Sequence, residues 1–245
     1  MNNAPRLVTH DWVTPDLEYM TLSKKRAILT PVKEPTNCKT RLSDLLSPVE
    51  RGRLAWAMFM DLGRALSEVR TACTVFVVTS YDRAARYARE AGFEVLLENG
   101  QLSESSSVDW ASGVLSSLGF DSVLRLPADI PLVQSEDLVL LLGAEAPSPG
   151  VLMVPSRDGT GTNAILRTPP QLFPSRFGPN SLALHIKEAE IAGAPYSIMP
   201  LERIALDIDE PADIQAFLQC ASGSDNETFR LLREIKMPER LANTN

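Results

Sequence analysis

The chain has 245 residues, of which 44% are hydrophobic and 22% charged, as in a globular protein with one substantial core. Its formal net charge of −7 argues against a protein devoted to binding nucleic acid, although it leaves room for a small anionic substrate. The apolar runs are far too short to span a bilayer, and we expect no secretory signal at the start of the chain.

Strands and helices alternate along the chain after an N-terminal extension, residues 1–25. The expected strands are 26–33, 74–80, 93–98, 121–129, 150–156, 163–167 and 196–201. The expected helices are 47–66, 82–92, 107–118, 135–142, 180–192 and 210–220, with one more at 227–236 inside a polar surface tail, 223–245. This alternation predicts one α/β domain, 26–222, whose open, mostly parallel sheet is covered by helices on both faces.

Ligands of such sheets bind beyond the carboxyl ends of the strands, so the residues that follow each strand are candidates for a site. Lys33 ends the first expected strand, and Lys39 and Arg41 come soon after it. Lysine supplies a point charge and arginine a two-pronged donor, which together suit a polyphosphate. The glycines of a Walker A loop are missing, and a solvated basic loop is the alternative interpretation.

Acidic residues are the next candidates. Asp129 lies at the tip of an apolar strand, between two prolines, where a carboxylate can bind Mg²⁺ or cap a turn or helix. Asp207 and Asp209 are two positions apart on an expected extended segment, so both side chains point to one face. A shared cation would offset their repulsion, with helix capping again the alternative. Asp213 fits the first turn of the helix that follows.

A glycine-rich turn, Asp-Gly-Thr-Gly-Thr-Asn at 158–163, separates two expected strands. Its unblocked backbone N–H groups predict a nest for an anion. Residues 177–181, Phe-Gly-Pro-Asn-Ser, lead into a helix whose N-terminus also attracts anions. Two ordinary turns are the alternative. Cations, acids and anion nests would all fall on one edge of the expected sheet.

The order of these motifs is similar to that of a known family. K-x5-KTRL, PADIP, GTGTNA, FGPNS and LDIDEPAD follow one another as in the CofC/FbiD family, and the resemblance covers residues 26–218. Members are guanylyltransferases that act on a phosphorylated three-carbon acid in the biosynthesis of the deazaflavin coenzyme F(420). The resemblance implies a Rossmann-like nucleotidyltransferase fold of the glycosyltransferase-A-like type. GTGTNA and FGPNS are fairly specific to the family, whereas PADIP and the last acidic motif are shared more widely.

The resemblance also implies roles for individual residues. The matching positions are Asp129, Asp207 and Asp209 for Mg²⁺; Lys33, Lys39 and Arg41 for the phosphates of GTP; and Thr162, Gly178 and Ser181 for the acid. Asp129, Lys33 and Asp209 would be the catalytic residues. The phosphate of the acid would attack the α-phosphorus of GTP in line and release pyrophosphate, with no covalent enzyme intermediate.

The chain departs from the family where members carry a Leu-Asn-x-Ala helix start. We match this motif to residues 108–111, Val-Asp-Trp-Ala. Asp109 replaces the asparagine, which implies altered contacts to the nucleotide. We expect Trp110 to pack in the core.

Several questions stay open at this level. A nucleotidyltransferase of the same fold for molybdenum cofactor or sugar phosphates would carry a GG-rich loop after the first strand, and this chain has none there. A non-catalytic nucleotide-binding module is disfavoured because all three candidate metal acids are present. A structural protein that binds a sugar phosphate would leave these acids unexplained. Phospholactate, phosphoenolpyruvate and 3-phosphoglycerate are equally compatible acceptors. The three cysteines form neither a zinc-site spacing nor a disulfide framework, so we expect a cytoplasmic enzyme, and a homodimer by analogy with the family.

Overall fold

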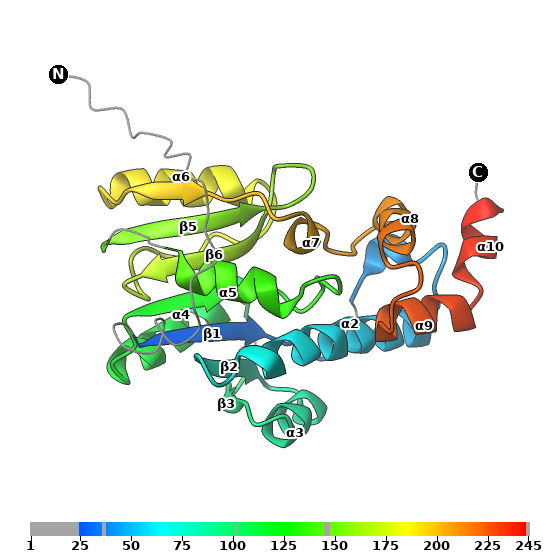
Figure 1. Cartoon of the computed structure of the whole chain (residues 1–245), viewed down its shortest axis with the longest axis horizontal. Helices are drawn as coiled ribbons and strands as arrows, with labels where there is room; N and C mark the ends of the chain where they lie inside the picture. The colour runs from blue at the N-terminus through cyan, green and yellow to red at the C-terminus, as the bar shows by residue number, and fades with distance from the viewer. Residues whose placement is uncertain (1–24, 36–37, 101, 145–147, 244–245) are drawn as a thin grey trace.

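A computed structural model of the chain describes residues 25–35, 38–100, 102–144 and 148–243. These residues form a seven-stranded sheet with the strand order β3-β2-β1-β4-β6-β5-β7 (Figure 1). The strands are β1 (Arg26–Pro31), β2 (Thr74–Thr79), β3 (Glu94–Leu97), β4 (Ser122–Arg125), β5 (Gly150–Pro155), β6 (Thr162–Thr168) and β7 (Tyr196–Ile198). All seven expected strands are confirmed, and most are shorter than predicted.

β1 lies inside the sheet because both of its faces are apolar. Ala27 and Leu29 point to one face and Ile28 to the other, and all three side chains are fully buried. β1 pairs in parallel with both β2 and β4, so the carboxyl ends of these strands meet at one edge of the sheet. The loops that follow β1 and β4 therefore begin side by side.

The prediction of a mostly parallel sheet is confirmed, with β6 as the exception. β6 pairs antiparallel with both β4 and β5, whereas β5 pairs in parallel with β7. A short turn joins β5 to β6, and a connection without a crossover element permits only antiparallel neighbours. The reversal brings Thr162 and Asn163, which begin β6, to the same edge as the carboxyl end of β4.

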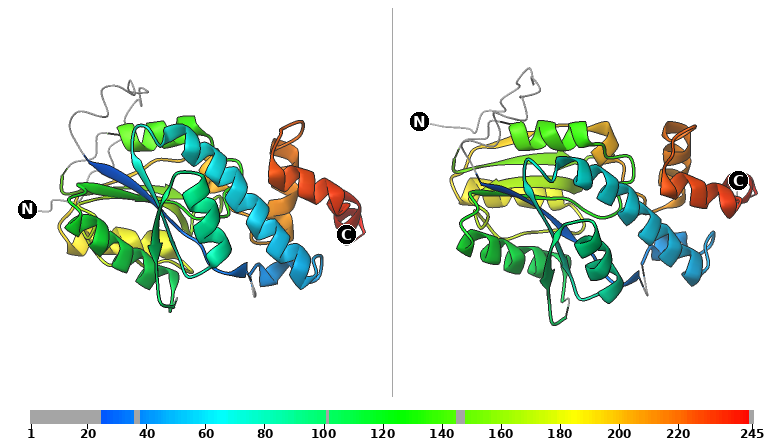
Figure 2. Two further views of the ribbon diagram at one scale, coloured as in Figure 1. Left: turned by 90° about the horizontal axis from the view of Figure 1, so that it is seen from below. Right: turned by 60° about the horizontal axis from the view of Figure 1, so that its bottom comes forward.

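Helices cover both faces of the sheet (Figures 1 and 2). On one face lie α2 (Pro48–Val69), α3 (Asp82–Glu90), α5 (Ser135–Gly143) and the short α7 (Glu202–Ala205). On the other lie α4 (Glu104–Ser117) and α6 (Ser181–Ile191). The longest helix, α2, begins as predicted: the Ser47 side chain accepts from the N–H of Glu50, the Glu50 side chain accepts from the N–H of Ser47, and a proline occupies the first turn.

The described C-terminal residues, 211–243, belong to the fold. α8 (Pro211–Cys220), α9 (Glu227–Glu234) and α10 (Met237–Ala242) pack beside the N-terminal half of α2, in a cluster that includes the fully buried Phe217 and Leu232 (Figure 1). Asp61 of α2 accepts hydrogen bonds from the N–H groups of Glu227 and Thr228, at 2.7 and 2.9 Å, and so caps α9. The helix expected near 227–236 is present as α9. For the described residues 223–243 the expectation of a surface tail is wrong, because apolar side chains anchor this segment to α2.

One helix begins earlier than expected. Ser103 accepts a hydrogen bond from the N–H of Ser106 at 3.1 Å, so α4 begins at Glu104 rather than near residue 107. Residues 108–111 therefore lie inside α4, and matching them to a helix start was wrong. The expectation that Trp110 packs in the core is also wrong, because this residue is 44% exposed.

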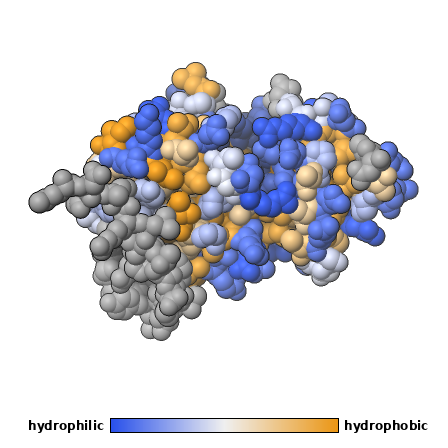
Figure 3. Space-filling view, turned by 90° about the horizontal axis from the view of Figure 1, so that it is seen from above, coloured by the Kyte–Doolittle hydropathy of each residue, from blue (hydrophilic) through white to orange (hydrophobic). Residues whose placement is uncertain are grey.

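None of the described helices is long and apolar enough to cross a membrane. Figure 3 shows the face that carries α6 and α8. Hydrophilic residues gather in the middle of this face, between those two helices, and hydrophobic residues are scattered around them. The predicted N-terminal extension lies outside the described residues, except for Lys25.

Candidate active site

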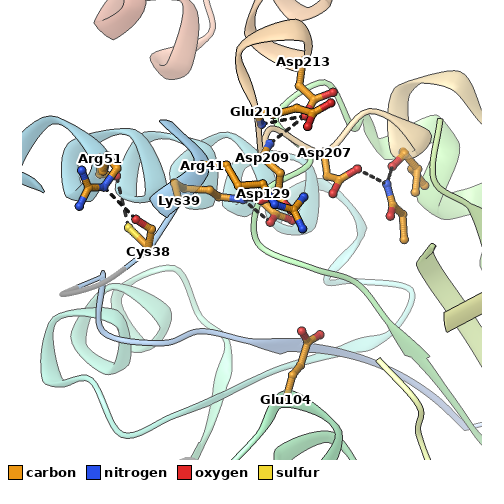
Figure 4. Close-up of polar contacts among 12 residues, drawn as sticks. Cys38, Lys39, Arg41, Arg51, Glu104, Asp129, Asp207, Asp209, Glu210 and Asp213 are labelled. Carbon is orange, nitrogen blue, oxygen red and sulfur yellow. Dashed lines mark hydrogen bonds and ion pairs between the residues drawn. The ribbon is translucent and has the colours of Figure 1, made fainter. Parts of the chain in front are cut away.

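Three carboxylates meet at the edge of the sheet. Asp129 lies just beyond the end of β4, and Asp207 and Asp209 lie between α7 and α8 (Figure 4). One oxygen of each carboxylate lies within 4.8 Å of the others. The N–H of Ile208 donates to the carbonyl oxygen of Asp129 at 3.1 Å, and this hydrogen bond holds the two segments together. The expectation that these acids lie close together is confirmed by the geometry.

Lys39 joins two of these acids. Its Nζ atom lies 2.6 Å from Asp129 Oδ2 and 2.6 Å from Asp209 Oδ1, and its side chain is largely buried. The backbone of Lys39 is left-handed, with φ of 51°, where the short 3₁₀ turn η2 (Thr40–Leu42) begins. This conformation is uncommon for a residue with a side chain, and the two ion pairs compensate for it.

The cluster carries more negative than positive charge. Burial, together with the neighbouring charges of Asp129 and Asp209, raises the pKa of Asp207 to about 6. Burial favours a lower pKa for Lys39, but the two carboxylates outweigh it and raise the pKa, so the ammonium stays charged. Lys39 in turn lowers the pKa of Asp129 despite burial. Three hard-oxygen donors opposed by one buried lysine can hold a divalent cation.

Two neighbouring cavities open beside the cluster, and Asp129 lines both. The first, of about 210 Å³, has aromatic walls that include Trp56 and Tyr81, and Lys33 also lines it. The second, of about 500 Å³, is polar, and Arg41 lines it. The Arg41 side chain is exposed, and its Nη1 atom lies 4.0 Å from Asp209 Oδ2. Of the three predicted cations, Lys39 contacts two of the acids and Arg41 lies near Asp209, whereas Lys33 shares only the first cavity with Asp129.

The second cavity also contains the three residues expected to bind the acid: Thr162, Gly178 and Ser181. The N–H of Thr162 donates to Ser181 Oγ at 2.8 Å, so the start of β6 is tied to the start of α6. Gly178 has φ of 125°, a conformation that strongly favours glycine, and nothing lies within 4 Å of where its Cβ would be. Backbone there can approach a ligand closely.

His185 is a fully buried residue behind this cavity, in contact with the lining residue Thr162, and no sequence motif indicated it. Its Nε2 atom accepts the N–H of Arg176 at 2.9 Å, so a neutral ring carries its proton on Nδ1, which lies 3.0 Å from Thr162 Oγ1. Burial, with the charges of Arg167 and Arg125, lowers the pKa of His185 to about 3, which keeps the ring neutral. Its position four residues after Ser181, on the same helix face, is the signal that could have revealed it.

The nest predicted in the turn 158–163 is not available to an anion. The N–H groups of Thr160 and Gly161 donate to Asp158 Oδ1 and Ser156 Oγ, at 3.0 and 2.7 Å, and that of Thr162 donates to Ser181. The prediction of unblocked N–H groups is therefore wrong, because the side chains of Asp158, Ser156 and Ser181 accept from these donors. Asn163 has another role, since its Nδ2 donates to Asp207 Oδ1 at 3.0 Å and orients that carboxylate.

Asp109 also differs from its expected role. Both of its carboxylate oxygens accept the N–H of Ser175 at 3.0 Å, and Oδ1 lies 3.4 Å from Nη1 of the buried Arg167. These contacts tie α4 to the loop before α6, and Asp109 does not line either cavity beside the acids. The effect on nucleotide contacts inferred from Asp109 has no support in this geometry. Asp213 behaves as predicted, because its carboxylate caps α8 and accepts the N–H of Asp209 at 3.0 Å.

Arg125 and Glu104 form an ion pair that the sequence analysis also missed. Arg125 ends β4 with a buried side chain, and Glu104 begins α4. Burial lowers the pKa of Arg125 to about 9, which leaves it charged at pH 7. An arginine inside an otherwise apolar strand was the available signal, because a buried charge needs a partner.

Comparison with known proteins decides the family. The sequence profile described as "Guanylyl transferase CofC like" matches residues 26–244, which is most of the chain. The chain belongs to this family. The CofC-like match includes α9 and α10, beyond the motifs recognised in the sequence. The predicted enzyme class, a nucleotidyltransferase of the guanylyltransferase kind, is thereby confirmed.

Individual CofC-like relatives have different acceptors in their names. The 2-phospho-L-lactate guanylyltransferase of Methanothermobacter thermautotrophicus is 32% identical, over 88% of this chain and 95% of its own. The 3-phospho-D-glycerate guanylyltransferase of Colwellia psychrerythraea is 32% identical, over 84% of this chain and 97% of its own. The phosphoenolpyruvate guanylyltransferase of Conexibacter woesei is 33% identical, over 77% of this chain and 85% of its own.

Solved structures confirm the predicted fold class. A nucleotidyl transferase from Methanothermobacter thermautotrophicus is 14% identical, covers 91% of this chain and 99% of its own, and has a TM-score of 0.56. A Desulfovibrio desulfuricans protein, described as a nucleotide-diphospho-sugar transferase, is 17% identical with a TM-score of 0.72, over 90% of this chain and 98% of its own. At such identities the likeness concerns the fold alone.

Proposed function

We propose that this enzyme transfers GMP from GTP to the phosphate of a small phosphorylated three-carbon acid and releases pyrophosphate, in the biosynthesis of coenzyme F(420). The observation that carries the proposal is that the three carboxylates and the predicted acid-binding residues line one cavity. An acceptor substrate in that cavity would lie beside the three aspartates, close enough for its phosphate to react with that of a nucleotide bound there. Family membership supports guanylyl transfer as the reaction.

A divalent cation, Mg²⁺, fits the donor set of Asp129, Asp207 and Asp209. Each acid offers a carboxylate oxygen, and these oxygens lie close enough together to share one ion. Bound there, Mg²⁺ would supply positive charge against the oxygens of the reacting phosphates. Asn163 supports this arrangement because its hydrogen bond orients the carboxylate of Asp207.

The basic residues would hold the triphosphate of GTP. Lys39 and Arg41 reach the acids from the loop after β1, and Lys33 lines the aromatic cavity. We assign that first cavity to the nucleoside, because aromatic side chains such as Trp56 and Tyr81 can pack against a base. The triphosphate would then lie between the two cavities, next to Asp129.

The transfer needs no covalent enzyme intermediate. An oxygen of the acceptor phosphate forms a bond to the α-phosphorus of GTP, while the bond from that phosphorus to the bridging oxygen breaks and pyrophosphate leaves. The residues of the chain would align the two phosphates and offset their charge, and such positioning and electrostatic stabilisation can account for catalysis. Thr162, Gly178 and Ser181 would hold the acid at the far side of the second cavity from the nucleoside.

The location and assembly of the enzyme are secondary proposals. Cys38, Cys73 and Cys220 are all free thiols, which supports a reducing cytoplasm. A homodimer stays a prediction, which light scattering of the purified protein would test.

Pyrophosphate release tests the reaction directly. Purified enzyme with Mg²⁺ and GTP is offered 2-phospholactate, phosphoenolpyruvate and 3-phosphoglycerate in separate reactions, with ATP and CTP as base controls. We expect release with GTP and at least one of the acids, and little with ATP or CTP. Absence of release with all three acids would reject the proposal and direct the search to sugar phosphates and molybdopterin.

A further inference from the structure

The Arg125–Glu104 pair lies at the junction of the two cavities, and both residues line both of them. The guanidinium of Arg125 is held on several sides. Its Nη1 atom donates to the carbonyl oxygens of Thr162 and Asn163, at 3.4 and 3.2 Å, and its carbon lies 4.0 Å from the centre of the Phe177 ring. Nη2 pairs with Glu104 Oε1. These contacts leave the guanidinium little freedom to move.

Glu104 is therefore a carboxylate held in place in the lining of a polar cavity. The Glu104 side chain is 33% exposed, whereas that of Arg125 is 5% exposed. Arg125 therefore holds the carboxylate from the buried side, and the carboxylate of Glu104 stays accessible from the cavity. Figure 4 shows Glu104 rising from α4 on the opposite side of the site from the three aspartates. A molecule in the second cavity would therefore lie between Glu104 and the three aspartates, all of which line this cavity.

A carboxylate at this position favours a substrate that can donate a hydrogen bond to it. An ionised carboxylate only accepts hydrogen bonds, and it repels another anion unless that anion brings a donor to it. Of the three acceptors named for relatives, 2-phospholactate and phosphoenolpyruvate carry their phosphate on the carbon next to the carboxylate and have no free hydroxyl. In 3-phosphoglycerate that carbon carries a free hydroxyl, which can donate to a carboxylate.

We propose that Glu104, held by Arg125, is a specificity-determining residue that selects an acceptor with a free hydroxyl beside its carboxylate, such as 3-phosphoglycerate. This inference rests on the proposed function and names its substrate class. A site that offers an acceptor to a substrate hydroxyl discriminates against analogues that lack the hydroxyl, because they lose that hydrogen bond. Glu104 would thus favour one acid and disfavour the other two.

The test compares kcat/KM for the three acids in wild type, Glu104→Ala and Glu104→Gln. Wild type should prefer 3-phosphoglycerate. Glu104→Ala should lower the ratio of kcat/KM for 3-phosphoglycerate to that for phosphoenolpyruvate by about 10- to 100-fold, the loss of a hydrogen bond to a charged group. Glu104→Gln keeps an acceptor of the same shape without the charge and should fall between. The ratio is independent of the folded fraction, so partial misfolding does not affect the result.

Glu234→Ala is the matched control. Glu234 pairs with Arg53 on the surface at 2.8 Å, and it lines neither cavity of the site, so its removal should leave the ratio unchanged. A wild-type preference for phosphoenolpyruvate or phospholactate would overturn the inference while leaving guanylyl transfer intact. An unchanged ratio in Glu104→Ala with a raised KM for GTP would also overturn it, and would assign Glu104 to the ribose hydroxyls. Absence of pyrophosphate release with all three acids would reject the proposed function and the inference together.

Discussion

The Nδ1 atom of His185 lies 3.0 Å from the hydroxyl oxygen of Thr162. Because Nε2 already accepts the N–H of Arg176, the neutral ring must donate from Nδ1, and Thr162 Oγ1 must accept. The hydroxyl proton of Thr162 is then free to donate elsewhere in the second cavity, which Thr162 lines. The histidine thus fixes the direction in which the hydroxyl can act on a bound acid.

Two substitutions of His185 separate its two contacts. The amide of Asn reaches the position of Nδ1, whereas that of Gln reaches the position of Nε2. We expect His185→Gln to raise KM for the acid by about 3- to 10-fold, the value of one hydrogen bond, and His185→Asn to raise it less. Steady-state kinetics with KM for GTP as the internal control checks this. Equal effects of both variants on the acid would contradict an orienting role.

His185 should also make stability depend on pH. Its pKa is about 3 in the folded protein and near 6.5 when unfolded, so the unfolded chain binds the extra proton between these values. The free energy of unfolding should therefore fall as pH drops from about 6.5 toward 3, by at most about 1.4 kcal/mol per pH unit from this residue. Urea unfolding of wild type and His185→Asn across this range measures the difference.

That difference isolates the histidine from Asp207. The raised pKa of Asp207 has the opposite effect on the free energy of unfolding. The stabilisation that it contributes is present at low pH and is lost as pH rises through about 6. Both proteins retain Asp207, so its contribution cancels on subtraction. A wild-type curve parallel to that of the variant would show that His185 titrates normally.

The three acids should be indispensable for turnover. Asp129→Asn and Asp209→Asn each remove a carboxylate charge with little change of shape, and we expect turnover to drop by at least about 10²- to 10³-fold with the fold intact. Circular dichroism and pyrophosphate release measure the two properties. Asp225→Asn, on the exposed segment before α9, is the control and should stay active. Activity retained by either site variant at saturating Mg²⁺ would reject the metal assignment.

Lys39 and a divalent cation should compete for the same carboxylates. Lys39→Met removes the ammonium that contacts Asp129 and Asp209, so the free enzyme should bind Mn²⁺ roughly tenfold or more tightly, while turnover with GTP falls. Lys33→Met is the matched control, because Lys33 is an exposed residue of the aromatic cavity; it should weaken GTP binding without a change in metal affinity. Titration calorimetry measures both affinities. Weaker metal binding by Lys39→Met would mean that Lys39 supports the ion rather than replacing it.

Thr162→Val should separate the two substrates. Valine keeps the shape of threonine but cannot accept from His185 or donate to a bound acid, so we expect KM for the acid to rise by about tenfold and KM for GTP to stay within about twofold. The ring N–H left unpaired should also lower the free energy of unfolding by about 1 to 3 kcal/mol. Kinetics and urea unfolding of the same preparation check both effects. Equal losses for the two substrates would show that Thr162 does not belong to the acid site.

Residues adjacent to strand ends could be predicted from the sequence. The alternation of apolar segments determines where strands end, and a parallel sheet gathers those ends at one edge. This is why Asp129 and the loop of Lys39 could be placed at one site, and the motif order supplied the rest of the cluster. The same reasoning found α2, because Ser47 and Glu50 act through contacts only three residues apart.

Contacts between distant segments were decided by the tertiary structure. Arg125 and Glu104 are 21 residues apart, and His185 and Thr162 are 23 apart, so no local pattern pairs them. The nest at 158–163 failed for a similar reason, because Ser181 takes up a donor that looked free in the sequence. Local periodicity is a property of neighbouring residues, whereas the partner of a buried polar group depends on which strands and helices pack together.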